Sequence, residues 1–199
     1  MTGMRRVAWI AVMLLAAGVV GEPSLARARK AESVEELMNP LLSPDYALWL
    51  VGPIARIATR EEIESYLRAT SDEEAREVID EFWRRRDTAP AYAGNPLRER
   101  FEERVAEADR LYSEAGLPGR RTDRGTIFVL YGPPAEERFD IPEHPDDPPL
   151  LVWAYPADAG EGLDGKRPER LYRFIKRGDL TTFFTPNRRP PRPRFDRPP

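Results

Sequence analysis

Residues 119–134 read Gly-Arg-Arg-Thr-Asp-Arg-Gly-Thr-Ile-Phe-Val-Leu-Tyr-Gly-Pro-Pro. A polar segment leads into six β-favouring residues, 126–131, and Gly132-Pro133-Pro134 ends the run. Both faces of such a strand would be largely apolar, which is typical of a central strand that is covered on both sides. The stretch therefore predicts one buried strand, placed where a helical half of the chain meets a strand-rich half.

The segments before this stretch carry helix-start signals. The Ser/Thr-x-x-Glu spacing of a capping box occurs at residues 33–36, 59–62 and 71–74. After the third signal, apolar residues follow the spacing of a core-facing helix, at Ala75, Val78, Ile79, Phe82 and Trp83. Asn95 is a suitable cap for a further helix that begins at Pro96 and ends near residue 115. Its expected inward side chains are Leu97, Phe101, Val105, Ala108, Leu111 and Tyr112.

The remaining apolar runs are short. Residues 46–51 fit either a strand or a buried helical turn, and the strand is the favoured interpretation. Residues 150–155 predict a strand, and residues 171–176 and 180–184 predict a hairpin around Gly178. The expected fold class is α+β, with a helical N-terminal half packed on a small, mainly antiparallel sheet of three or four strands.

Several spaced motifs resemble the bacterial GWxTD domain family, which takes its name from a Gly-Trp-x-Thr-Asp sequence. The likeness covers about residues 59–155 and includes a segment similar to the family's Phe-Trp-x-x-Arg-Asp at residues 82–87. Asn95, Arg104, Ala108 and Asp109 add to it. The candidate binding or structural residues that it marks are Trp83, Arg86, Asp87, Asn95, Thr122, Asp123, Arg124, Gly125, Tyr131, Gly132, Pro133 and Pro134.

The sequence departs from the family pattern at two places. Arg120 stands where the motif has its tryptophan, and Glu107-Ala108-Asp109 stands where a Tyr-Ala-Asn triplet is expected. The resemblance implies a fold and an exported bacterial protein, and it implies no particular reaction.

The chain has 199 residues, 41% of them apolar, which suits one domain with a real core. A signal peptide that is cleaved after residue 28 is predicted by three features: two arginines, the apolar run 7–20 and Ala26-Arg27-Ala28. A retained membrane anchor is the alternative. The expected organisation is a signal peptide at 1–28, an N-terminal segment at 29–58, the α+β domain at 59–187 and a disordered tail at 188–199, which holds five Arg, five Pro and one Asp.

Several chemistries lack their sequence signals. The chain has no cysteine, and it contains no phosphate-binding loop, dinucleotide fingerprint or Gly-x-Ser-x-Gly elbow. The single histidine, His144, lies among acids that could hold a divalent cation, but the surrounding prolines favour a stiff loop whose acids are solvated. No metal site and no cofactor are predicted.

Two polar clusters leave alternatives open. The arginine run 84–86 either matches the negative end of a helix dipole or binds an anion. Residues 122–125 either hold the backbone or contact a ligand. We expect Asp123 to hold backbone amides, with Arg86 or Arg124 as its counter-charge.

These observations favour a non-enzymatic interaction or structural module that is periplasmic or secreted. The expected partners are a protein or another envelope component, together with an anionic surface that the basic tail contacts, and no specific nucleic acid. The alternative is a ligand-binding or hydrolytic domain that uses a groove near Arg86 and Asp123.

Overall fold

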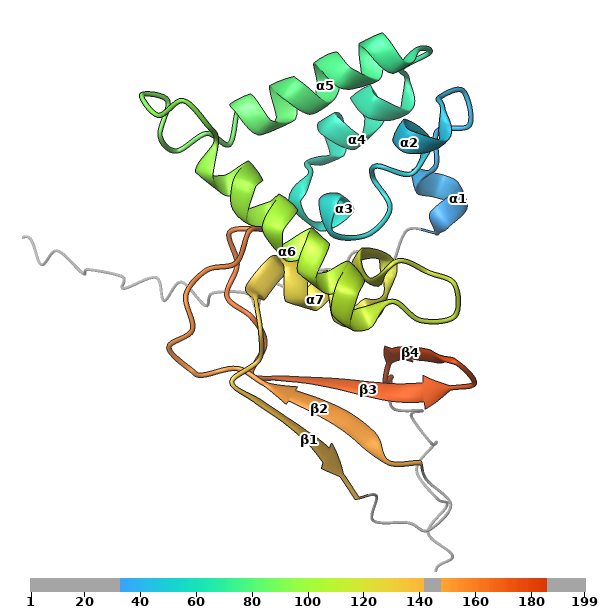
Figure 1. Cartoon of the computed structure of the whole chain (residues 1–199), viewed down its shortest axis with the longest axis vertical. Helices are drawn as coiled ribbons and strands as arrows, with labels where there is room; N and C mark the ends of the chain where they lie inside the picture. Colours follow the sequence, from blue (N-terminus) through green and yellow to red (C-terminus); the bar gives the residue numbers. More distant parts are fainter. Residues whose placement is uncertain (1–32, 142–147, 186–199) are drawn as a thin grey trace, which may run out of the picture. The chain divides into compact units, whose positions relative to one another are not determined.

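A computed structural model of the protein describes residues 33–141 and 148–185. Helices come first and one antiparallel sheet follows, so the α+β prediction is confirmed (Figure 1). The predicted signal peptide, the loop with His144 and the tail 188–199 lie outside the described residues. The helices are α1 (Val34–Leu37), α2 (Pro44–Ala47), α3 (Pro53–Ile57), α4 (Arg60–Leu67), α5 (Asp72–Arg84), α6 (Pro96–Tyr112), the 3₁₀ turn η1 (Gly119–Arg121) and α7 (Asp123–Tyr131). The strands are β1 (Glu136–Asp140), β2 (Leu150–Ala154), β3 (Leu171–Arg177) and β4 (Leu180–Phe183).

The predicted helix starts of the N-terminal half are confirmed. Ser33 and Thr59 each form a reciprocal capping box at the start of α1 and α4, and the Ser71 hydroxyl caps α5. Helices α1–α3 lie in residues 33–58, and Leu37, Leu50 and Ile54 from this region are buried in the same core as the later helices.

Helix α6 begins as predicted, because the Asn95 side chain accepts hydrogen bonds from the amides of residues 97 and 98 and Pro96 follows it. The helix ends at Tyr112, before the predicted residue 115, and Ala115 and Gly116 take positive φ values of 51° and 76°. Leu111 is 43% exposed, so its predicted inward position is wrong. It lies beside the narrow buried stripe that Phe101, Val105 and Ala108 form.

The favoured strand at residues 46–51 is wrong, and the alternative of a helical turn is correct. Pro44 begins α2, and turns continue to the start of α3. Proline suits the first position of a helix because it has no amide hydrogen to leave unpaired there. The Tyr66 hydroxyl donates a 2.6 Å bond to the Tyr46 carbonyl, which ties the turn to α4.

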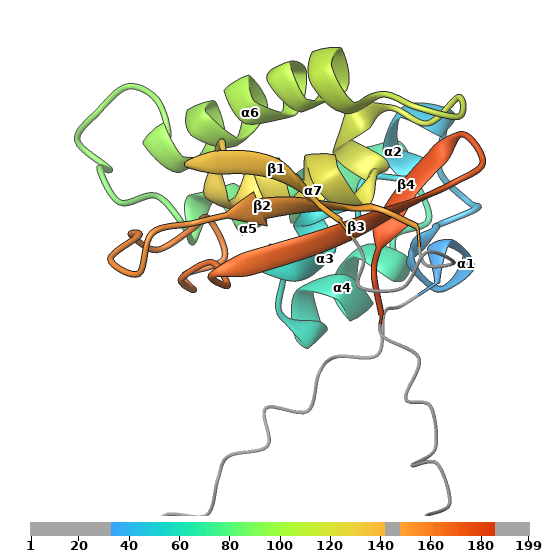
Figure 2. The ribbon, with the colours of Figure 1, turned by 90° about the horizontal axis from the view of Figure 1, so that it is seen from below.

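The predicted central strand at residues 126–131 is also wrong, because these residues belong to helix α7. The prediction of a fully covered element is nevertheless correct, since every residue from 125 to 130 is buried. Helix α7 contacts α3, α6, η1 and β4. It lies next to α6 and above the sheet in Figure 1, and it lies behind strands β1 and β2 in Figure 2. A helix covered all round has no polar face, so hydrophobic periodicity does not distinguish it from a buried strand.

Hydrogen bonds at both ends of α7 favour a helix over a strand for these residues. The Thr122 hydroxyl accepts from the Gly125 amide at 3.1 Å and donates to the Gly119 carbonyl at 2.8 Å. At the other end the Arg104 guanidinium donates to the carbonyls of residues 129 and 130, at 3.1 and 3.0 Å. These contacts pair groups that helix ends otherwise leave without partners in a dry interior.

The sheet has the order β1-β2-β3-β4, with all neighbours antiparallel. The predicted strand at 150–155 and the hairpin around Gly178 are confirmed as β2 and β3–β4. Strand β1 was not predicted, because four of its five residues are charged and its first four are exposed. One sheet face joins the core through Trp153, whose ring lies 5.3 Å from that of Tyr112 on α6.

Gly125 offers a test of the buried helix. A Cβ atom at this position would collide with the Gly119 carbonyl, although Gly→Ala inside a helix ordinarily stabilises by about 0.5–1 kcal/mol. We expect Gly125→Ala to lower the free energy of unfolding by about 1–3 kcal/mol in chemical denaturation. Gly160→Ala is the matched control, because a Cβ atom there meets no atom within 4 Å. Equal stability of the two variants would contradict the close packing of α7 on η1.

Candidate functional site

The twelve candidate residues gather at two joints of the fold. Trp83, Arg86, Asp87 and Asn95 lie where α5 turns into α6, and the other eight lie along α7 and just beyond its end. We call the first the arginine joint, which also includes Glu62 of α4, and the second the α7 joint, which also includes Glu114 and β4.

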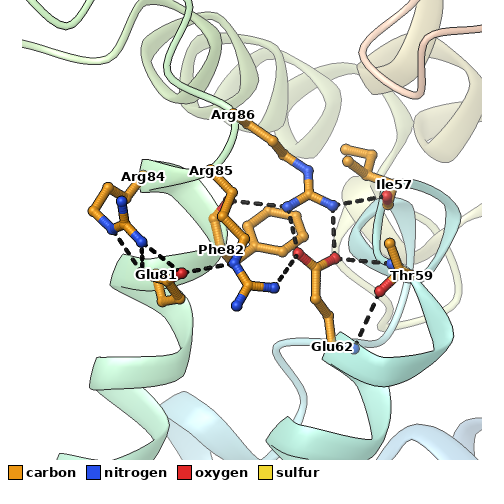
Figure 3. Close-up of polar contacts among 8 residues, drawn as sticks. All are labelled: Ile57, Thr59, Glu62, Glu81, Phe82, Arg84, Arg85 and Arg86. Carbon is orange, nitrogen blue, oxygen red and sulfur yellow. Dashed lines mark hydrogen bonds and ion pairs between the residues drawn. The ribbon is translucent and has the colours of Figure 1, made fainter.

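The arginine joint is organised by Arg86 (Figure 3). Its Nη1 and Nη2 atoms donate to the two carboxylate oxygens of Glu62 at 2.8 and 2.6 Å. The same nitrogens bind the carbonyls of Phe82 and Ile57 at 2.9 and 3.2 Å, and the guanidinium carbon lies 3.7 Å from the centroid of the Phe82 ring. Arg86 therefore joins α3, α4 and α5, and its terminal nitrogens already hold four oxygen partners.

Glu62 is held in its charged form. Burial raises the pKa of its carboxyl, but the bonds from Arg86 and from the Thr59 amide outweigh burial, so the pKa lies below its ordinary value. The side chains of Glu62 and Arg86 are only 9% and 18% exposed, in contrast to Arg84 and Arg85, which are exposed and pair with Glu81. Within the predicted run, Arg86 is thus bound inside the protein, whereas Arg84 and Arg85 form ion pairs on the surface.

The other residues of this joint fix the turn between α5 and α6. The Trp83 ring is 4% exposed and packs against Phe101 at a centroid distance of 5.1 Å. The Asn95 amide donates to the Trp83 carbonyl at 2.7 Å, while its oxygen caps α6. The Asp87 carboxylate accepts from the Ala89 amide at 2.9 Å.

The α7 joint connects the start of α7 to the sheet edge. Asp123 Oδ2 accepts from the Phe183 amide of β4 at 2.6 Å. The expectation that Asp123 holds a backbone amide agrees with this contact, but the expected counter-charge is wrong: Arg86 pairs with Glu62, and Arg124 pairs with Glu114 at 3.0 Å. Burial raises the pKa of Asp123, and the Phe183 amide and Arg56 oppose that rise.

Glu114 has an equal part in this joint, although no sequence motif pointed to it. Its carboxylate accepts from the Thr181 amide at 3.0 Å, from the Thr181 hydroxyl at 2.9 Å and from Arg124. Thr181 and Phe183 are two residues apart on β4, so their amides point to the same side, away from β3. Two carboxylates thus take the place of a further strand along the β4 edge.

The end of α7 is fixed by the remaining candidate residues. The Tyr131 hydroxyl donates to Asp164 at 2.9 Å, and the Tyr155 hydroxyl donates to the Gly132 carbonyl at 2.8 Å. Gly132 has φ 81° and ends the helix, and Pro133 and Pro134 lead into β1.

The two departures from the family pattern contact each other. The Asp109 carboxylate accepts from the Arg120 amide and Nε, both at 2.8 Å, and it also forms an ion pair with Arg120 Nη2. The arginine that stands in the position of the motif tryptophan is therefore matched by an acid on α6.

The clefts formed by the described residues include two of about 440 and 110 Å³, and neither of these is lined by Arg86 or Asp123. The larger, of about 440 Å³, is lined by residues of α2, α5 and α6 and by Trp49. The smaller, of about 110 Å³, includes Arg120 and Arg121 in its lining. Residues 33–141 and 148–185 hold no group of three potential metal ligands, and none of their helices has the length and apolar character for a bilayer crossing.

The buried pair of the arginine joint gives a charge-specific prediction. Glu62→Gln keeps the shape and one acceptor of the side chain but leaves Arg86 without a counter-charge, so we expect a loss of about 1–3 kcal/mol at pH 7. Glu64→Gln, in an exposed pair with Arg60, should cost less than about 1 kcal/mol. The folded-state pKa of Glu62 is lowered, so its stabilisation is present above the unfolded pKa and is lost as the pH falls through the folded value. Denaturation of each variant across pH 3–7 measures this, and a pH-independent difference would contradict it.

Asp123 should show the opposite pH dependence. Its folded-state pKa is raised, so ionisation lowers stability as the pH rises through that value. Asp123→Asn keeps an acceptor for the Phe183 amide, and we expect its stability relative to the parent to improve with rising pH. Asp123→Ala leaves that amide without its partner and should be about 1–3 kcal/mol less stable than Asp123→Asn in denaturant titration at every pH. Equal stability of the two Asp123 variants would show that the contact does not hold β4.

No curated protein and no solved structure matches the chain. A family model, described as the GWxTD domain, matches residues 43–157 and so covers more than half of the chain. The match runs from α2 to β2, so it contains the arginine joint and all of the α7 joint apart from β4. On this evidence the chain belongs to the GWxTD domain family.

Proposed function

We propose that the protein is an exported, non-enzymatic interaction module whose motif residues build its framework. The observation that carries this proposal is that the polar motif side chains are bound inside the fold. Arg86 binds Glu62, Asn95 caps α6, and at the α7 joint Thr122, Asp123 and Arg124 bind backbone groups or Glu114.

Catalysis needs polar groups that can reach a substrate. Asp123 accepts the Phe183 amide at 2.6 Å, and the terminal nitrogens of Arg86 are taken by Glu62 and two carbonyls. A ligand at either position would have to replace contacts that join secondary-structure elements. A framework role for the motif, with recognition by other surfaces, is the simpler account of these contacts.

Export is supported by the N-terminal sequence. Arg5 and Arg6 precede an apolar run, and Ala26-Arg27-Ala28 has the small-x-small pattern of a cleavage site. We expect intact-mass measurement of protein from an envelope fraction to give a chain that begins at Arg29. A mass that retains Met1 would contradict cleavage and favour a membrane anchor.

The proposed partner is a protein or another envelope component, and we assign the tail 188–199 a role in contacting anionic surfaces. The tail has a net charge of +4 from five Arg and one Asp. Cleavage after residue 28 would remove three Arg and one Glu, which leaves 28 basic and 33 acidic residues and a net charge of −5. Residues 29–187 then carry −9, so opposite charges are separated along the chain.

Removal of the tail tests this assignment. We expect deletion of residues 188–199 to weaken binding to vesicles with anionic lipid at low salt and to leave the melting temperature unchanged. Neutral vesicles and binding at high salt are the controls. Equal binding by the full and shortened chains at low salt would rule out the tail as the contact.

A further inference from the structure

The smaller cleft, of about 110 Å³, lies between the α2–α3 region, α6 and η1. Its wall is mainly apolar, and its polar lining consists of Asp45, Arg120 and Arg121. The apolar lining includes Leu48, Trp49, Val51, Ile54, Phe101 and Val105. The cleft thus combines a small hydrophobic wall with two arginine residues and one aspartate in its lining.

Arg121 differs from Arg120 in having no counter-charge. Arg120 is paired with Asp109, whereas the Arg121 side chain makes no hydrogen bond or ion pair with any residue in the described ranges. Its Nε atom is buried and unpaired, and the residue as a whole is half-buried. A buried N–H group without an acceptor is unfavourable, because it loses water without gaining a hydrogen-bond partner.

The backbone that carries Arg121 is closely confined. A Cβ atom on Gly119 would collide with the Ala108 carbonyl of α6, and one on Gly52 would lie 2.8 Å from the Arg120 carbonyl. Gly52 also has φ 107°, which disfavours other residues. Helix α6 and the turn before α3 therefore hold η1 from two directions, so the position of Arg121 at the cleft is set before any ligand arrives.

The size and chemistry of the cleft limit what it can hold. A cavity of about 150 Å³ accommodates a benzene molecule, so about 110 Å³ suits a smaller apolar group such as an isobutyl group. A guanidinium binds a carboxylate through two parallel hydrogen bonds, which is the strongest pairing open to it. Asp45 at the rim is exposed and opposes an anion, so the attraction must come from Arg121.

We propose that this cleft binds a carboxylate that is attached to a small branched apolar group, with Arg121 as the carboxylate-binding residue. Two sources share this chemistry: the C-terminal residue of a peptide and a short free branched acid. The apolar group lies against the wall of the cleft, and the carboxylate supplies the partner that Arg121 lacks.

NMR titration of the full chain with three probes tests the proposal. N-acetyl-leucine mimics a peptide C-terminus, isovalerate is a free branched acid, and N-acetyl-leucinamide has the same apolar group without the charge. We expect at least one of the two acids to bind at least about tenfold more tightly than the amide. Binding of N-acetyl-leucine alone assigns a peptide terminus, and binding of isovalerate assigns a free acid as an accepted ligand. Failure of both acids to bind, or equal binding of the amide, would overturn the proposal without any mutation.

Matched variants locate the binding residue. Arg121→Gln should weaken acid binding at least about tenfold, while Arg173→Gln, which removes an exposed charge from β3, should leave it unchanged. Asp45→Asn should strengthen acid binding by about twofold to fivefold, because it removes an opposing charge at the rim. If Arg121→Gln and Arg173→Gln bind equally well, Arg121 is not the carboxylate-binding residue. If Arg121→Gln does not fold, the acid and amide comparison on the unmodified chain still decides between the outcomes.

Discussion

Burial of residues 125–130 of α7 on all sides is the constraint on which the rest of the structure depends. A helix without a polar face has to pair its terminal amides and carbonyls inside the protein, because water does not reach them. Thr122 satisfies an amide at one end, and Arg104 reaches two carbonyls at the other from the adjacent helix. Helix α7 contacts α3, α6, η1 and β4, so its removal would take away the element that connects the helices to the edge of the sheet (Figure 1).

The polar residues of the family motif act at the joints where this buried helix meets its neighbours. Asp123 and Glu114 hold two amides of β4 that no strand pairs, so the start of α7 and the edge of the sheet are connected by side chains. The ion pair between Arg86 and Glu62 has a similar role between α4 and α5. The contact between Arg120 and Asp109 likewise connects η1 to α6, at the position of the motif tryptophan.

The partly buried arginines of this protein differ in whether the fold supplies them with an oxygen partner. At the joints, each partly buried arginine has oxygen partners: Arg86 has Glu62, Arg104 has carbonyls and Arg124 has Glu114. Arg121 has no such partner among the described residues, although it belongs to the same short turn as the paired Arg120. A positive charge that the fold positions but does not neutralise is the feature that indicates a ligand.

Local sequence determined the features whose physical basis is local. Capping residues predict the starts of α1, α4, α5 and α6, because each cap bonds to amides two or three positions along the chain. The β3–β4 hairpin follows from two β-favouring runs and the glycine between them. The motif spacing identified the family, and it marked part of each joint but neither Glu62 nor Glu114.

Tertiary structure alone decided the choices that depend on distant residues. Residues 126–131 favour a strand by propensity, yet they are helical because α6 supplies Arg104 to the end of the helix and a protein environment covers every side of it. The partner of Asp123 is an amide 60 positions away, and Glu114 binds Thr181 across 67 positions, so no local pattern could reveal either contact. The charged strand β1 exists because β2 pairs with it, and Arg121 is distinctive only because no acceptor among the described residues bonds to its side chain. In each case the deciding energy comes from groups far apart in sequence, which local propensity and periodicity do not contain.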